Sequence, residues 1–218
     1  MLTTLAAPAF ADIWHIEDGD ITVKASGTEG KNTVSQGNKK DVEDTDTIIT
    51  NREDKASSNT VTIEAKDKDD KVEVTLKDVN IDTSSRNKAA VSVTGEGDTN
   101  IKLDGDNALK SDIYRSGIYG SGSGSLTISG GENDSLTAQG GSGANGISSS
   151  GSLTISGGTV TANGDDGGRG ISSSGSVTIS GGSTVTANGG SGTISGGDGI
   201  WSGGGVTISG GSTVTANG

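Results

Sequence analysis

Two aromatic side chains, Tyr119 and Trp201, have the residue type and spacing best suited to binding a ligand. Each directly follows the isoleucine of a Gly-Ile pair, and the same pair occurs twice more between them. Because side chains alternate between the two faces of a strand, an inward isoleucine places the next residue outward. The four outward residues would then form one column, about 14 Å long at the usual spacing of strands: Tyr119, Ser148, Ser172 and Trp201.

A second column is expected beside the first, because a polar residue precedes each of these four glycines. Its members are Ser116, Asn145, Arg169 and Asp198. Sugars pack their apolar faces on aromatic rings while polar neighbours bond their hydroxyl groups. We therefore expect a few sugars of a polysaccharide to bind at Tyr119, Trp201, Asn145, Arg169 and Asp198. The alternative role for the two rings is to cover the ends of a narrow core.

Calcium is the one metal for which the sequence offers candidate ligands. Asp104 and Asp106 lie in "DGDN", and Asp165 and Asp166 lie in "DDGGRG". Carboxylates in loops suit Ca²⁺, but "DGDN" lacks the glycine and distal glutamate of an EF-hand loop. We expect no required cofactor, with calcium as a candidate ligand of these four aspartates.

Catalytic side chains are scarce. The chain has one histidine, His15, and no cysteine, so no convincing serine–histidine–acid set can be assembled. Lyase chemistry would need calcium-binding acids and a base on one face, which only Asp165, Asp166 and Arg169 offer. A solvated corner is the better explanation of those three residues. We expect no enzymatic activity, and a calcium-dependent polysaccharide lyase is a lesser alternative.

A short repeat must position these residues. Its clearest copies, each continuing Thr-Ile-Ser-Gly-Gly, are spaced 27, 24 and 29 residues apart and begin at Leu126, Leu153, Val177 and Val206. Weaker copies are expected to begin at Val74 and Ile101. A unit of nearly constant length with variable loops is typical of a solenoid.

Each unit predicts three short strands joined by glycine corners. In the copy that begins at residue 151, "SLTIS" and "TVTA" alternate apolar and polar residues, and "GISSS" supplies a third strand. Valine, isoleucine and threonine favour strands, and glycine permits sharp corners. The predicted fold is all-β, a right-handed parallel β-helix with about 24–29 residues and three strands per rung. The handedness follows from the general crossover rule and from the resemblance given below.

Stacked threonines suggest a further hypothesis. Pairs of the form Thr-x-Thr recur at Thr159 and Thr161, and in two later rungs. Regular threonine ladders occur on β-solenoid ice-binding proteins, so ice binding is a lesser alternative function. The suitability of threonine for an exposed strand face explains the pattern equally well.

The domain organisation follows from composition. Residues 1–11, "MLTTLAAPAFA", end in an A-x-A pattern and resemble a signal-peptide remnant, which favours a secreted or cell-surface protein. Residues 12–58 are expected to form an N-terminal cap and irregular first coils, with a solvated loop over 35–46. Residues 59–218 are expected to form the β-helix, truncated at its C-terminus.

The charge distribution excludes two classes of partner. The net charge is -12, and residues 1–112 hold 23 of the 28 acidic residues and 14 of the 16 basic ones. Without a basic patch, the acidic surface would repel nucleic acid and anionic lipid. No stretch after residue 11 is apolar enough to insert into a membrane. The oligomeric state is left open.

The stretch "IKLDGDNAL", followed by repeated "SLTISGGTVTANG" and "GIS", resembles secreted bacterial carbohydrate-binding β-helix domains. The resemblance covers roughly residues 60–218, and similar repeats occur in adhesin-like surface proteins. It implies a fold like that of polysaccharide lyases, binding of cellulose or acidic polysaccharides, and calcium in some members. We therefore expect non-catalytic binding of a plant cell-wall polysaccharide or an acidic glycan. The main alternative is a structural, adhesin-type surface stalk.

Overall fold

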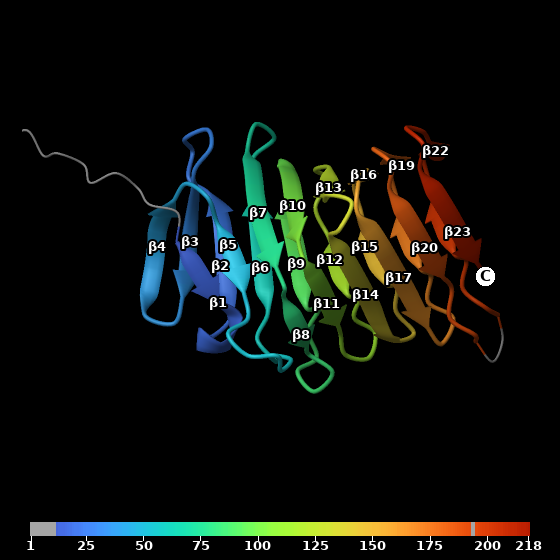
Figure 1. Cartoon of the computed structure of the whole chain (residues 1–218), viewed down its shortest axis with the longest axis horizontal. Helices are drawn as coiled ribbons and strands as arrows, with labels where there is room; N and C mark the ends of the chain where they lie inside the picture. Colours follow the sequence, from blue (N-terminus) through green and yellow to red (C-terminus); the bar gives the residue numbers. More distant parts are fainter. Residues whose placement is uncertain (1–11, 193–194) are drawn as a thin grey trace, which may run out of the picture.

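The chain forms a β-solenoid in which successive coils stack along one axis (Figure 1). The structure is a computed structural model and describes residues 12–192 and 195–218. Three sheets run along the stack, and the six strands of sheet C mark about six turns. One short 3-10 helix, η1 (Ile16–Asp18), is the sole helical element of the described residues. The expected all-β solenoid with three strands per rung is confirmed.

From residue 71 onward, successive strands of the chain enter the sheets in the order A, C, B, whereas the earlier strands belong to sheets A and B alone. Sheet A consists of β1 (Ile13–His15), β5 (Ile48–Thr50), β7 (Lys71–Lys77), β10 (Asp98–Asp104), β13 (Leu126–Ser129), β16 (Leu153–Ser156), β19 (Val177–Ser180) and β22 (Val206–Ile208). Sheet C consists of β8 (Asn80–Asp82), β11 (Asp106–Lys110), β14 (Ser135–Ser142), β17 (Thr159–Asp165), β20 (Thr184–Asn188) and β23 (Thr213–Asn217). Sheet B consists of β21 (Ile200–Ser202), β18 (Ile171–Ser173), β15 (Ile147–Ser149), β12 (Ile118–Gly120), β9 (Val91–Gly95), β6 (Val61–Ala65), β2 (Ile21–Ala25), β3 (Asn32–Gln36) and β4 (Lys39–Asp44).

The core is a set of apolar columns between the three sheets. In sheet A, the parallel register pairs Leu126 with Leu153, Leu153 with Val177, and Val177 with Val206. The first three of these side chains are at most 1% exposed and form a buried column. Val206 continues the column in the last coil, where it is 46% exposed. Each coil therefore buries its inner face against its neighbours, as a solenoid requires.

The weaker upstream copies of the repeat are shifted by two residues from their expected positions. Leu126 pairs with Thr99 and not with Ile101, and Thr99 pairs with Val72 and not with Val74. Thr99 occupies the inward position. Because threonine is polar, the sequence lacks an apolar residue where the repeat would begin. Because side chains alternate with a period of two, the shift leaves each residue on its predicted face.

Thr99 should destabilise the column in which it lies. Its side chain is 2% exposed, and its hydroxyl has no hydrogen-bond partner. A buried hydroxyl without a partner loses its bonds to water without compensation. Thr99→Val is therefore expected to stabilise the protein by about 1 kcal/mol in urea unfolding. The control, Thr178→Val on the outward face of the same sheet, should change stability by less than about 0.5 kcal/mol; an equal gain in both variants would contradict this account.

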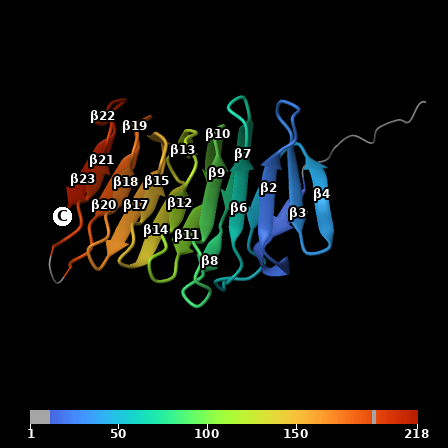
Figure 2. The ribbon, with the colours of Figure 1, turned by 180° about the vertical axis from the view of Figure 1, so that it is seen from behind.

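An antiparallel hairpin closes sheet B at the N-terminal end of the stack. Strand β3 pairs antiparallel with both β2 and β4 (Figure 2). The prediction of a solvated loop over residues 35–46 is therefore wrong, since Lys39–Asp44 forms an edge strand. Its exposed charged side chains are also typical of a loop, which explains the wrong prediction. In an edge strand, such charges prevent pairing with a further strand. Trp14, 1% exposed, anchors this strand by donating its Nε1 hydrogen to Asp44 Oδ2 at 2.8 Å.

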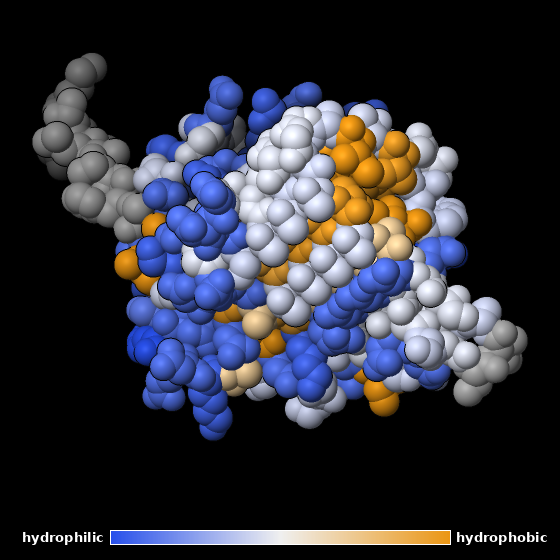
Figure 3. All heavy atoms as spheres, turned by 45° about the vertical axis from the view of Figure 1, so that its right-hand side comes forward, coloured by the Kyte–Doolittle hydropathy of each residue, from blue (hydrophilic) through white to orange (hydrophobic). Residues whose placement is uncertain are grey.

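The last coil presents apolar side chains to solvent. Val206 and Ile208 of β22 are 46% and 51% exposed, and Figure 3 shows apolar residues gathered at this end beside rows of nearly neutral ones. Within the described residues, no helix is long and apolar enough to cross a membrane. The expected signal-peptide remnant, residues 1–11, lies outside the described residues.

Candidate functional site

The outward face of sheet B carries the aromatic column in the expected register. Tyr119 pairs with Ser148, Ser148 with Ser172, and Ser172 with Trp201. Tyr119 is 45% exposed and Trp201 is 38% exposed. The isoleucines that precede the first three of these residues are fully buried, so the inward and outward assignments hold. Two exposed rings separated by two serines form a surface to which a linear ligand can bind.

The second column is a continuous chain of polar contacts. Asn145 Oδ1 accepts a hydrogen bond from the backbone N of Arg169 at 2.8 Å. Arg169 Nε in turn donates to Asp198 Oδ2 at 3.0 Å, and both side chains are partly exposed. Ser116, 6% exposed, belongs to the wall of the solenoid and is hardly accessible. The structure thus brings Asn145, Arg169 and Asp198 together beside the aromatic column.

Arg169 also contacts Trp201 directly. Its guanidinium Cζ stands over the indole ring, 4.8 Å from the ring centroid. A guanidinium in this position is attracted to the electron-rich face of the ring. Ser172, the strand neighbour of Trp201, is only 8% exposed although it lies in the outward column. Arg169 therefore covers part of one face of the Trp201 indole, which lies beside Ser172 on the outward face of sheet B.

A small pocket lies at the Tyr119 end of the column. Its volume is about 240 Å³, and its lining includes Tyr114, Arg115, Tyr119, Asn145 and Ser148. Two tyrosines and an arginine around a cavity combine ring surface with a charged hydrogen-bond donor. Sequence reasoning selected Tyr119 and Asn145 but missed Tyr114 and Arg115. The available signal was a tyrosine–arginine pair at a corner where the next two rungs have Gly143-Ala144 and Gly167-Gly168.

The backbone holds Tyr114 in an unusual conformation. Its φ is 59°, in the left-handed region that non-glycine residues rarely adopt, and its N donates to Ser142 O at 2.9 Å. The same corner position has a positive φ in the neighbouring rungs, at Asn87, Gly143 and Gly167. The ring of Tyr114 lies against Gly143, where a Cβ atom would approach Tyr114 Cε1 to 2.8 Å. The glycine of the next rung therefore makes room for the tyrosine of this one.

Arg115 differs from the other arginines in its electrostatic surroundings. The chain has four arginines, and three of them form ion pairs with Asp18, Asp20 or Asp198. Among the residues that the structure describes, Arg115 alone of the four has no carboxylate at salt-bridge distance. Its Nε donates to Asn87 Oδ1 at 3.2 Å. Because its guanidinium has no carboxylate partner, Arg115 is available to an anionic group of a ligand, although the net charge of the chain is -12.

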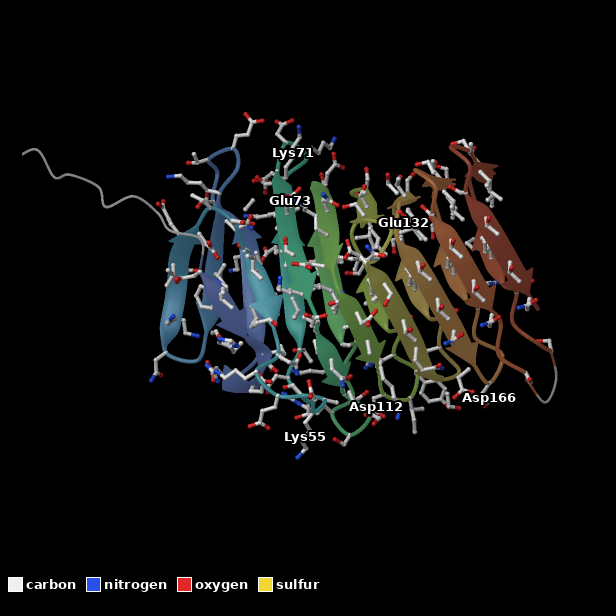
Figure 4. All side chains as sticks on the ribbon, viewed as in Figure 1. Lys55, Lys71, Glu73, Asp112, Glu132 and Asp166 are labelled. Atoms are coloured by element: carbon white, nitrogen blue, oxygen red, sulfur yellow. The ribbon has the colours of Figure 1, made fainter. Side chains whose placement is uncertain are left out.

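Three of the four aspartates considered for calcium contact other side chains. Asp104 is paired with Lys77 at 2.7 Å, and Asp106 accepts a hydrogen bond from Ser135 Oγ at 2.6 Å. Asp166 accepts from Ser142 Oγ at 3.1 Å and lies, with its neighbour Asp165, at a corner loop (Figure 4). Over residues 12–192 and 195–218, no three histidine, aspartate or glutamate side chains are grouped closely enough to hold a metal ion.

A wider cleft of about 580 Å³ lies along the beginning of sheet A, near Lys71 and Glu73 (Figure 4). Four carboxylates and two lysines line it, together with threonine, serine and asparagine side chains. No aromatic ring lines this cleft, so it offers no surface for stacking a sugar. This cleft could not be predicted from the sequence, because its walls come from the N-terminal strands and from four separate rungs.

The single histidine lies in the N-terminal coil. His15 ends β1 in the N-terminal coil, and its buried Nδ1 has no hydrogen-bond partner. It lines neither the 240 Å³ pocket nor the 580 Å³ cleft.

Sheet C presents regular polar ladders. Two columns of threonines stack in register: Thr159, Thr184 and Thr213 form one, and Thr161, Thr186 and Thr215 form the other. Beside them, Asn188 Nδ2 donates to Asn163 Oδ1 at 2.8 Å, and Asn217 Nδ2 donates to Asn188 Oδ1 at 2.7 Å. The asparagine ladder uses its amides to link successive coils.

Comparisons of the chain with protein-family models, with curated proteins and with solved structures found no match.

Proposed function

We propose that this protein binds a polysaccharide, without catalysis, on the outward face of sheet B. The observation that carries this proposal is the aromatic column, in which Tyr119 and Trp201 are exposed in one register of the sheet. Exposed rings on a sheet otherwise covered by serines have no packing role that requires them. Stacking of sugar rings is the chemistry that such a surface provides best.

The pocket beside Tyr119 supports the proposal independently of the column. Tyr114 is 77% exposed and held at a positive φ, and together with Tyr119 it gives the pocket two ring surfaces. Asn145 and Ser148 supply amide and hydroxyl groups for the hydroxyls of a sugar. One sugar ring would occupy this pocket, and the chain would continue along the column toward Trp201.

Among polysaccharides, an acidic glycan fits the charge of this face best. Arg115 and Arg169 are the only basic residues after Lys110, and both lie next to an aromatic side chain of the face. A planar carboxylate can accept two parallel hydrogen bonds from a guanidinium. We propose that the protein acts outside the cell or at its surface, which the leader-like residues 1–11 support.

The rival function is a structural stalk on a cell surface. The in-register threonine and asparagine ladders of sheet C would serve a rigid spacer equally well. A stalk does not require Tyr114, Tyr119 and Trp201 to be exposed, whereas a binding face does.

A glycan array with and without calcium separates the two functions. Binding to carboxylated plant or bacterial polysaccharides, unchanged by a chelator, is the expected result. Binding to no glycan on the array would favour the stalk. Binding that disappears with the chelator would restore a role for calcium.

A further inference from the structure

Arg169 occupies the place where a sugar would stack on Trp201. The guanidinium stands over the indole, with Cζ 4.8 Å from the ring centroid. A sugar ring and a guanidinium cannot both lie on the same area of one indole face. A ligand that stacks on that area of Trp201 must therefore displace Arg169.

Two contacts hold Arg169 in this position. Its Nε donates to Asp198 Oδ2 at 3.0 Å, and its backbone N is fixed by Asn145 Oδ1 at 2.8 Å. The side chains of Arg169 and Asp198 are 39% and 58% exposed, so water and salt weaken the ion pair. The guanidinium is thus held firmly enough to cover the ring and weakly enough to be displaced.

We propose that Arg169 is a displaceable lid on Trp201 that determines which glycans bind at this end of the face. This proposal rests on the proposed function and assigns selectivity to one residue of it. A neutral glycan must break the Arg169–Trp201 and Arg169–Asp198 contacts and gains no ionic contact in return. A carboxylated glycan breaks the same contacts, but its carboxylate then accepts hydrogen bonds from the released guanidinium.

Removal of the lid should therefore shift the two affinities in opposite directions. In Arg169→Ala, binding of a neutral cello-oligosaccharide is expected to become about 3- to 10-fold tighter, because one exposed cation–π contact and one exposed ion pair no longer oppose it. Binding of an oligogalacturonide is expected to become about 3- to 10-fold weaker, because a charge-assisted hydrogen bond is lost. Isothermal titration of both ligands into both proteins measures the two changes.

The matched control is Arg52→Ala. Arg52 forms an exposed ion pair with Asp18 in the N-terminal coil, at 2.6 Å, and lies over no aromatic ring. This variant changes the net charge by the same amount and should leave both affinities unchanged. A second control, Trp201→Ala combined with Arg169→Ala, should abolish the gain for the neutral ligand.

A measurement without ligand tests the lid directly. Of the two tryptophans, Trp14 is 1% exposed, so collisional quenching of fluorescence by acrylamide reports chiefly on Trp201. Quenching should increase in Arg169→Ala and, by a smaller amount, in Asp198→Asn, which releases Arg169 from its anchor. Unchanged quenching in Arg169→Ala would overturn the proposal.

The outcomes distinguish failure of this proposal from failure of the proposed function. If the wild type binds either oligosaccharide and Arg169→Ala shifts both affinities in the same direction, the lid is wrong and glycan binding stands. If neither oligosaccharide binds to either protein, glycan binding at this face fails, and the selective role of Arg169 fails with it.

Discussion

Leu153→Asp is expected to reduce the free energy of unfolding by about 3–5 kcal/mol. Leu153 is fully buried and lies between Leu126 and Val177 of the adjacent coils. An aspartate there would either carry an unpaired charge in an apolar column or be protonated at the expense of its normal solvation. It would also remove apolar packing on both sides, so neighbouring coils would lose their main contact in sheet A.

Urea unfolding followed by far-UV circular dichroism measures this effect. The control is Thr154→Asp, one residue further along β16, where the side chain points outward and is half-buried. That variant should cost less than about 1 kcal/mol, because its carboxylate remains in contact with water. Equal losses in the two variants would mean that Leu153 and Thr154 do not lie on opposite faces of the strand.

Tyr119→Ala is expected to weaken glycan binding by about 1–3 kcal/mol, which corresponds to about 5- to 150-fold in the dissociation constant. The ring serves both the aromatic column and the 240 Å³ pocket, so its loss removes stacking surface from two places. Because the side chain is 45% exposed, its removal should change the melting temperature little. Titration calorimetry and thermal unfolding of the same sample measure the two quantities.

Ser92→Ala is the matched control for Tyr119→Ala. Ser92 precedes Tyr119 in the same outward column, one rung toward the N-terminus, and carries no ring. Its replacement should leave the affinity within about twofold of the wild type, since the half-buried hydroxyl offers a ligand no stacking surface. A sharp fall in melting temperature for Tyr119→Ala, with unchanged affinity, would make Tyr119 a structural cover of the core.

The parts of the fold that repeat could be predicted from the sequence. Alternation within a strand is a local property, so the inward Leu153 and the outward Tyr119 and Trp201 follow from neighbouring residues alone. The spacing of the copies then aligns Tyr119 with Trp201, and the ladder pairs confirm that alignment.

The parts that depend on corner geometry could not be predicted in this way. Tyr114 takes a corner position that is Asn87, Gly143 or Gly167 in neighbouring rungs, and the contact of its ring with Gly143 depends on how adjacent corners stack. The register of Thr99 was missed because a polar residue fills an inward position. The edge strand Lys39–Asp44 was missed because charge on an edge strand and charge in a loop look alike in a sequence.

Mapping of amide chemical shifts shows directly whether the outward face of sheet B binds a glycan. A short oligogalacturonide would be titrated into isotopically labelled protein, with a cello-oligosaccharide as the neutral comparison. We expect saturable changes in amide chemical shift at residues 114–119, 145–148, 169–172 and 198–202. Shifts along the threonine ladders of sheet C should change little. Saturable shifts centred on sheet C or on the cleft of sheet A, or no saturable shift with either ligand, would contradict glycan binding at the outward face of sheet B.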